Sequence, residues 1–107
     1  MARLIVRAAA DAEIDAIAAR IAENNLTAAL RFYDRVQETY ERLLEWPLCG
    51  PRARVRIASL QGLRTYPIQG FRNYIIFYLP LKQGIEVVHV LHGARNVRKV
   101  LRSGEKG

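Results

Sequence analysis

The sequence has little cysteine, and this excludes two kinds of small protein. Cys49 stands alone among 107 residues, so neither an internal disulfide framework nor a zinc site built on thiolates is available. A single thiol is compatible with a reducing compartment, and we expect a cytoplasmic protein. Long apolar runs are also missing: none approaches the ~20 residues of a membrane span, and the N-terminus has no apolar signal core.

Acidic residues are scarce relative to cations. The chain has 17 Lys and Arg against 10 Asp and Glu, a formal net charge of +7, and 14 of the cations are Arg. The planar guanidinium suits phosphates and carboxylates. We therefore expect an acidic partner, either a nucleic acid or an acidic protein segment, unless the charge serves only as a solvated surface.

Known catalytic and cofactor patterns are absent from the sequence. There is no Ser-His-acid pattern, no P-loop and no glycine-rich dinucleotide turn. His89 and His92 are three residues apart on an expected strand, so they should point to opposite faces and cannot share a metal. We expect no metal and no cofactor.

One enzymatic hypothesis remains, metal-free cleavage of RNA. It needs a general acid or base and cations that stabilise the charged phosphorane. The candidate acid or base is His92, with Tyr74 as a stacking or acid group. The candidate phosphate ligands are Arg64, Arg72 and Arg95. The alternative for His92 is a hydrogen-bonded structural residue at a strand end.

The length of the chain predicts a single domain of residues 1–102 followed by a flexible tail, 103–107. Leu4 to Arg7 predicts a short first strand with Leu4 and Val6 on one face. Two amphipathic helices should follow, one from about Asp11 to Glu23 and one capped by Thr27 that ends at Trp46-Pro47. The first stripe is Ile14, Ile17, Ala18 and Ile21, and the second is Ala29, Phe32, Tyr33, Val36, Tyr40, Leu43 and Leu44.

The turn between the two predicted helices is short, so the helices should fold back on each other as an antiparallel pair. The densest β-branched and aromatic stretch, Phe71 to Arg95, predicts two long antiparallel strands joined by residues 80–84. Leu63 to Ile68 should form a further strand, with Pro67 where no ladder donor is needed. Residues 48–61 are expected to be a loop, and Ala94 to Arg102 a short basic helix or an extended segment. The predicted class is α+β, a two-helix hairpin packed on a mostly antiparallel sheet.

Two helices can cover only one face of this sheet. Alternation along the first long strand favours Phe71, Ile75, Phe77 and Leu79 as the core face. The opposite face, with Tyr74, Tyr78 and His89, would then be an exposed apolar patch with arginines at its border. Such a patch suits an acidic amphipathic segment, added as a helix or as a strand. The alternative is that the chain's own basic C-terminal segment covers it.

Taken together in order, six short segments resemble the ParE branch of the ParE/RelE superfamily of toxins from bacterial type II toxin-antitoxin modules. The segments are A-E-I-D-A-I from Ala12, A-A-L-R-F-Y-D-R around Phe32, P-L-C-G-P-R from Pro47, G-L-R from Gly62, Y-I-I-F-Y from Tyr74 and V-L-H-G-A-R-N from Val90. The one departure is Asn96, where the family usually has Asp. This puts in doubt any role for a carboxylate at position 96.

The resemblance implies a ParD-like antitoxin wrapped over the toxin, DNA gyrase as the target of the freed toxin, growth arrest as the outcome and no catalytic turnover. Relatives closer to RelE are ribosome-dependent mRNA endonucleases, which is the alternative function. A non-toxic module that only binds the antitoxin is a second alternative. The residues expected to bind the antitoxin are Arg64, Arg72, Tyr74, Tyr78, His89 and Arg95. Those expected to bind the target are Arg95, Arg98, Lys99 and Arg102.

Overall fold

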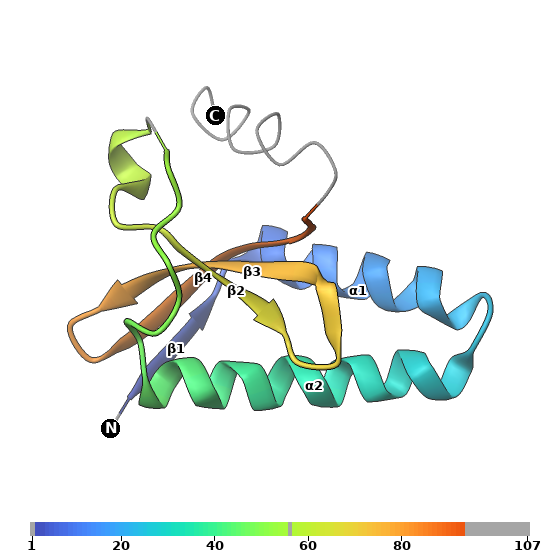
Figure 1. Ribbon diagram of the computed structural model, residues 1–107. Coiled ribbons are helices and arrows are strands. Elements are labelled where there is room, and N and C mark those ends of the chain that lie inside the picture. The colour runs from blue at the N-terminus through green and yellow to red at the C-terminus, as the bar shows by residue number, and fades with distance from the viewer. Residues whose placement is uncertain (1, 56, 94–107) are drawn as a thin grey trace.

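The computed structural model describes residues 2–55 and 57–93, and these form two layers (Figure 1). The elements in chain order are β1 (Arg3–Val6), α1 (Ala8–Ala22), α2 (Leu26–Glu45), the short 3₁₀ helix η1 (Ala58–Leu60), β2 (Arg64–Ile68), β3 (Phe71–Leu81) and β4 (Gly84–His92). The four strands make one sheet in the order β1-β4-β3-β2. Only the β1–β4 pair is parallel. The predicted α+β class is confirmed. The expected segment 94–102 and the tail 103–107 lie outside the described residues.

The two helices form the expected antiparallel pair and bury the stripes that the sequence indicates. Ala10, Ile14 and Ala18 of α1 and Phe32, Val36 and Leu43 of α2 pack in one core with the sheet. α1 begins at Ala8, three residues before the expected Asp11, because Arg7 is extended and three consecutive alanines follow it. α2 begins after Asn25, whose side chain accepts a hydrogen bond from the Ala28 amide at 3.0 Å. The prediction of Thr27 as the cap was wrong, since Thr27 lies inside the helix.

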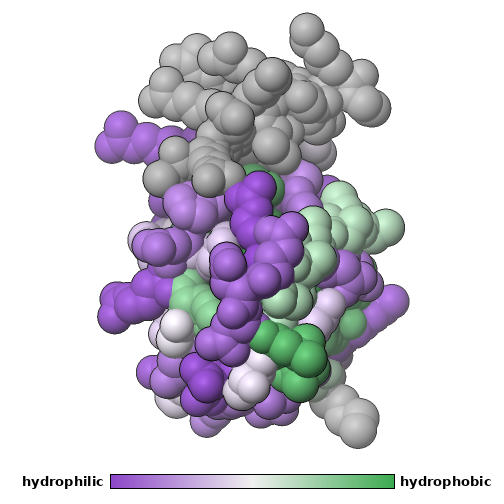
Figure 2. Space-filling model, turned by 90° about the vertical axis from the view of Figure 1, so that its right-hand side faces the viewer, coloured by the Kyte–Doolittle hydropathy of each residue, from purple (hydrophilic) through white to green (hydrophobic). Residues whose placement is uncertain are grey.

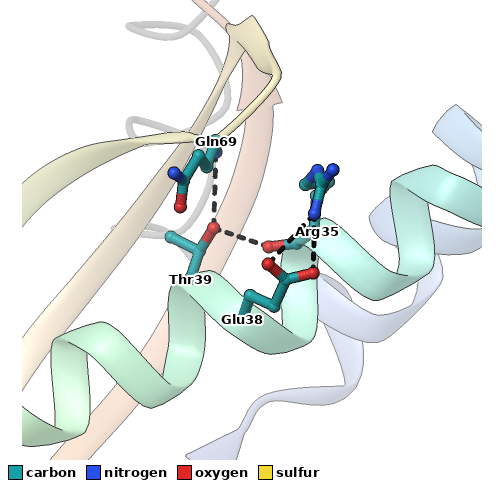
Figure 3. A network of polar contacts seen from close by, with 4 residues as sticks. All are labelled: Arg35, Glu38, Thr39 and Gln69. Atoms are coloured by element: carbon teal, nitrogen blue, oxygen red, sulfur yellow. Dashed lines mark hydrogen bonds and ion pairs between the residues drawn. The ribbon is translucent and has the colours of Figure 1, made fainter.

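The turn between β2 and β3 is fixed on α2 by a small polar network (Figure 3). The hydroxyl of Thr39, which is almost fully buried, donates to the Arg35 carbonyl at 2.6 Å and accepts from the Gln69 amide at 3.4 Å. Arg35 in turn forms an ion pair with Glu38 at 2.8 Å. The Gln69-Gly70 turn is where the sequence places it, and Thr39 determines its position against the helix.

The assignment of the sheet faces was wrong, because the helices cover the face of Tyr74, Ile76 and Tyr78, and a bulge brings Phe71 to that same face. Pro67 pairs with Ile75 whereas the next residue, Ile68, pairs with Phe71. Three residues of β3 therefore fall between the two pairs, and an odd number reverses the alternation. As a result Phe71 and Tyr74 share the helix-covered face. The residues of β3 that pack in that core are Phe71, Tyr74, Ile76 and Tyr78.

The second face of the sheet is covered by the chain itself, not left as an open patch. It carries Ile75, Phe77 and Leu79 of β3 with Val88 and Leu91 of β4. Apolar residues of the 53–63 segment pack over it, so that Phe77 is 5% exposed and Val88 1%. They are Ala53, Val55, Ile57, Leu60 and Leu63. Apolar residues alternate with arginines over residues 52–57, but this pattern does not indicate which surface they cover, so the covering role could not be predicted.

Candidate functional site

The structure divides the predicted site residues among three places. Arg64 and Tyr78 lie together beside the loop that follows α2. Arg72 is exposed on the irregular part of β3. Tyr74, His89 and His92 lie near the end of β4 that faces α1. The predicted residues Arg95, Arg98, Lys99 and Arg102 lie outside the described part of the chain.

Tyr78 is fully buried, which corrects its expected place on an open surface. Its hydroxyl donates to the Pro47 carbonyl at 2.7 Å and accepts from the Gly50 amide at 3.1 Å. Burial raises the pKa of Tyr78, against the opposing effects of the Gly50 amide and the Arg64 charge. Arg64 completes the arrangement, since its Nη1 donates to the carbonyls of Leu48 at 3.2 Å and Gly50 at 2.7 Å.

This arrangement explains why the loop contains a glycine. A Cβ at position 50 would collide with the Thr65 carbonyl oxygen and lie 2.8 Å from the Tyr78 hydroxyl oxygen. Hydrogen bonds with Tyr78 and Arg64 thus fix the inner side of the loop. Trp46 and Leu48 remain exposed on its outer side. Tyr78 and Arg64 act here as structural residues that fix residues 46–50.

On the other edge of the β3–β4 pair, a glutamate side chain of α1 hydrogen-bonds to the edge of β4 where β1 stops. β1 ends at Val6, which pairs with Val87. Beyond it, the Glu13 carboxylate of α1 accepts the Val90 amide at 2.9 Å and contacts His89 Nδ1 at 3.0 Å. A strand edge that would otherwise be open is therefore closed by a helix side chain. The sequence gives no signal for this contact because 77 residues separate Glu13 from Val90.

A groove of about 240 Å³ opens beside this contact, between α1 and the ends of β3 and β4. One wall is a helical stripe at i, i+3, i+4 and i+7, and the other comes from the two strands. The lining residues are Glu13, Ala16, Ile17, Arg20, Tyr74, Val90, Leu91 and His92. The sequence analysis identified Tyr74 and His92 of this set as candidate site residues, but it gave Ala16 and Arg20 no role.

Aromatic packing fixes the strand wall of the groove. The Tyr74 ring lies edge to face against Phe32 of α2, with centroids 5.9 Å apart, and against His92, with centroids 5.3 Å apart. Such T-shaped contacts are the preferred geometry of aromatic pairs. Tyr74 therefore has its ring partly in the helix core and partly in the groove, which differs from the expected open sheet face.

The charged residues that line the groove differ in whether they have an ion-pair partner. Glu13 is paired with His89, whereas Arg20 forms no ion pair with any residue that the structure describes. Arg20 is also exposed at the end of the stripe. One end of an otherwise apolar groove thus carries an available guanidinium.

The residues of the ribonuclease hypothesis are only partly brought together. Tyr74 and His92 are cross-strand partners, but Arg64 pairs with Tyr78, four residues further along β3. At a rise of about 3.3 Å per residue the two pairs are separated by roughly 13 Å. The described residues also contain no group of three His, Cys, Asp or Glu that could hold a metal ion. Among the described candidates, Tyr74 and His92 therefore lie together, and Arg64 lies apart from them.

Apolar side chains are exposed at the α1–α2 end as well. Leu26 and Leu30 of α2 lie there, one helical turn apart. Figure 2 shows this end of the molecule, with green apolar surface among purple hydrophilic residues.

In the part of the chain that the structure covers, no helix is long and apolar enough to cross a membrane.

The elements and the sheet order are those of a small α+β protein with a groove at one end of the sheet. The family model for the ParE toxin of the type II toxin-antitoxin system, parDE, matches residues 4–97. The chain therefore belongs to the ParE toxin family.

A solved structure, described as the chromosomal ParDE TA system from P. aeruginosa, contains a chain that is similar in fold. The TM-score is 0.68 at 17% sequence identity, and the match covers 86% of this chain and 96% of that chain. At this identity the likeness establishes the fold alone. No curated protein matches the chain.

Proposed function

We propose that this chain is the toxin of a type II toxin-antitoxin pair, that a ParD-like antitoxin neutralises it, and that the freed toxin poisons DNA gyrase in the cytoplasm. The observation that carries the proposal is the family match over residues 4–97. The net charge of +7 supports an acidic protein partner. Binding without turnover is further supported by the separation of Arg64 from Tyr74 and His92.

The experiment is controlled expression of the toxin with and without a small acidic ParD-like protein. Growth arrest that the acidic protein relieves, together with a DNA-damage response and trapped gyrase–DNA cleavage complexes, is the expected result. Rapid translation arrest with cut mRNA would replace gyrase by the ribosome as the target. Normal growth in both cultures, with the acidic protein still bound, would identify a non-toxic binding module.

Two surfaces are assigned to the partners within this proposal. Arg72 is exposed and is proposed to meet the antitoxin, so Arg72→Glu should weaken the complex while Arg31→Glu on α2 should not. The basic residues Arg95, Arg98, Lys99 and Arg102 are proposed to contact the target. Reversing Arg98 and Lys99 should therefore reduce growth arrest and leave antitoxin affinity unchanged. Equal toxicity of this double variant would remove the C-terminal segment from the target interface.

A further inference from the structure

The groove between α1 and β4 is too small for a cofactor and large enough for a side chain. Pockets that bind small molecules typically enclose about 300–1,000 Å³. This groove has about 240 Å³ and is open to solvent on one side. A single large apolar side chain, delivered from another polypeptide, matches that volume.

The lining of the groove selects the kind of side chain. Ala16 and Ile17 of α1 and Val90 and Leu91 of β4 are the apolar residues of the lining. Glu13 already has two partners within the chain, the Val90 amide and His89. An incoming segment therefore gains chiefly by burying apolar area in the groove.

Arg20 determines the charge of the partner. It lies three residues after Ile17 on α1, so its guanidinium is about one helical turn from the apolar centre. It has no ion-pair partner in the described chain. An incoming segment with an acidic residue three or four positions from its apolar anchor would place a carboxylate on Arg20.

We propose that this groove is the anchor site for the antitoxin, which seats one apolar side chain between α1 and β4 and pairs a neighbouring carboxylate with Arg20. This proposal rests on the proposed function and names the contact through which the antitoxin holds the toxin. The mode is an amphipathic acidic segment laid into a preformed groove. Because Phe32 and His92 hold Tyr74 in place, the strand wall exists before the partner arrives.

The test uses two matched pairs of full-length toxin variants and the ParD-like antitoxin. Ala16 and Ala19 are both exposed residues of α1, and only Ala16 lines the groove. Ala16→Phe places a large side chain in the groove without removing a core contact. Ala19→Phe makes the same change at a position outside the groove, so the two variants lose the same amount of helix propensity. Likewise Arg20→Glu reverses the groove cation, and Arg31→Glu reverses an exposed cation on α2.

Affinity is measured by calorimetry, with thermal unfolding of each free variant as the check on folding. Ala16→Phe and Arg20→Glu should each weaken binding about tenfold or more, a change of about 1.4 kcal/mol. Ala19→Phe and Arg31→Glu should stay within about twofold of the wild type. A charge swap, in which a Lys on the antitoxin restores binding to Arg20→Glu, would identify the paired carboxylate.

Three results would overturn the proposal. Unchanged affinity of Ala16→Phe would remove the groove from the interface, while the wild-type complex would still support the proposed function. Failure of the wild-type toxin to bind the antitoxin would overturn both. If the groove variants instead lower the unfolding temperature by more than their matched controls do, or dissociate a dimer of the toxin alone, the groove is occupied by the toxin's own chain or by a second copy.

Discussion

Two buried tyrosines on the helix-covered side of the sheet are used in different ways. The Tyr78 hydroxyl has two backbone partners, Pro47 and Gly50. The Tyr40 hydroxyl is buried without a hydrogen-bond partner among the described residues. A buried hydroxyl with partners stabilises the residues it contacts, whereas one without a partner contributes mainly through its ring.

Replacing Tyr78 by Phe should release the loop at residues 46–50. The change leaves the Pro47 carbonyl and the Gly50 amide without their partner, at a cost of about 1–3 kcal/mol in the free energy of unfolding. Urea unfolding measures this loss of stability.

The matched control for that variant is Tyr33→Phe. Tyr33 also loses a hydrogen bond, to Asp15 at 2.7 Å, but its side chain is 42% exposed. Urea unfolding should show a change within about 0.5 kcal/mol for this control. An equal loss in the two variants would mean that the loop anchor contributes no more than a surface contact.

Alkaline pH should destabilise the fold, with Tyr40 as a main contributor. Burial raises the pKa of Tyr40, and the charge of Asp11 adds to the effect. The folded state therefore holds the phenolic proton more tightly than the unfolded state. Its contribution to stability is complete below the ordinary pKa of about 10 and is lost as the pH rises above that value, at up to about 1.4 kcal/mol per pH unit.

Tyr40→Phe removes this titration and should flatten the decline. Denaturant unfolding between about pH 9 and 11 measures the slope. Identical slopes for wild type and Tyr40→Phe would show that other groups cause the alkaline loss.

Among the elements, those with a regular apolar period could be predicted and those governed by distant contacts could not. The helices follow from the spacing of Ile14, Ala18, Phe32 and Val36, and all four strands follow from β-branched and aromatic runs. The sheet faces could not be assigned, because both faces are apolar and are covered by different parts of the chain, and the bulge at Pro67/Ile68 changes the alternation near Phe71. The Glu13 contact with β4 likewise depends on residues far apart in sequence.

The candidate site was predictable only in part for the same reason. Tyr74, His89 and His92 stand out in the sequence as polar or aromatic residues in an apolar strand. Their surroundings are supplied by α1, whose Arg20 looks like any other surface cation until the fold places it at the groove. Tyr78 was misplaced because its buried hydroxyl is satisfied by a loop 28–31 residues away.

The start of α2 offers a direct comparison of the predicted and the observed cap. Asn25→Ala removes the side-chain acceptor of the Ala28 amide and should cost about 1 kcal/mol of stability. Thr27→Ala should change stability by less than about 0.5 kcal/mol, since Thr27 lies exposed in the first turn. Thermal or urea unfolding of the two variants distinguishes them, and a larger loss for Thr27→Ala would contradict the cap assignment.

At the scale of the whole molecule, the excess of positive charge should govern how fast an acidic partner is captured. The formal charge of +7 creates a field that steers oppositely charged proteins. Raising the salt from about 50 mM to about 500 mM should lower the association rate constant of the antitoxin by about tenfold or more, with a smaller effect on dissociation. Stopped-flow mixing measures both rates, and an association rate independent of salt would assign the charge to solubility alone.

The pairing of the first strand with the last determines when this protein becomes complete during its synthesis. Arg3 of β1 pairs with Gly84 of β4, and the backbones approach so closely that a Cβ at Gly84 would collide with the Arg3 carbonyl. The N-terminal strand therefore waits for its partner until β4 has been made, several seconds later at about 5–20 residues per second. The same strand, β4, forms one wall of the groove. A nascent chain consequently has neither the finished sheet nor the finished groove until β4 has been made, and only then can a partner that uses the groove bind to it.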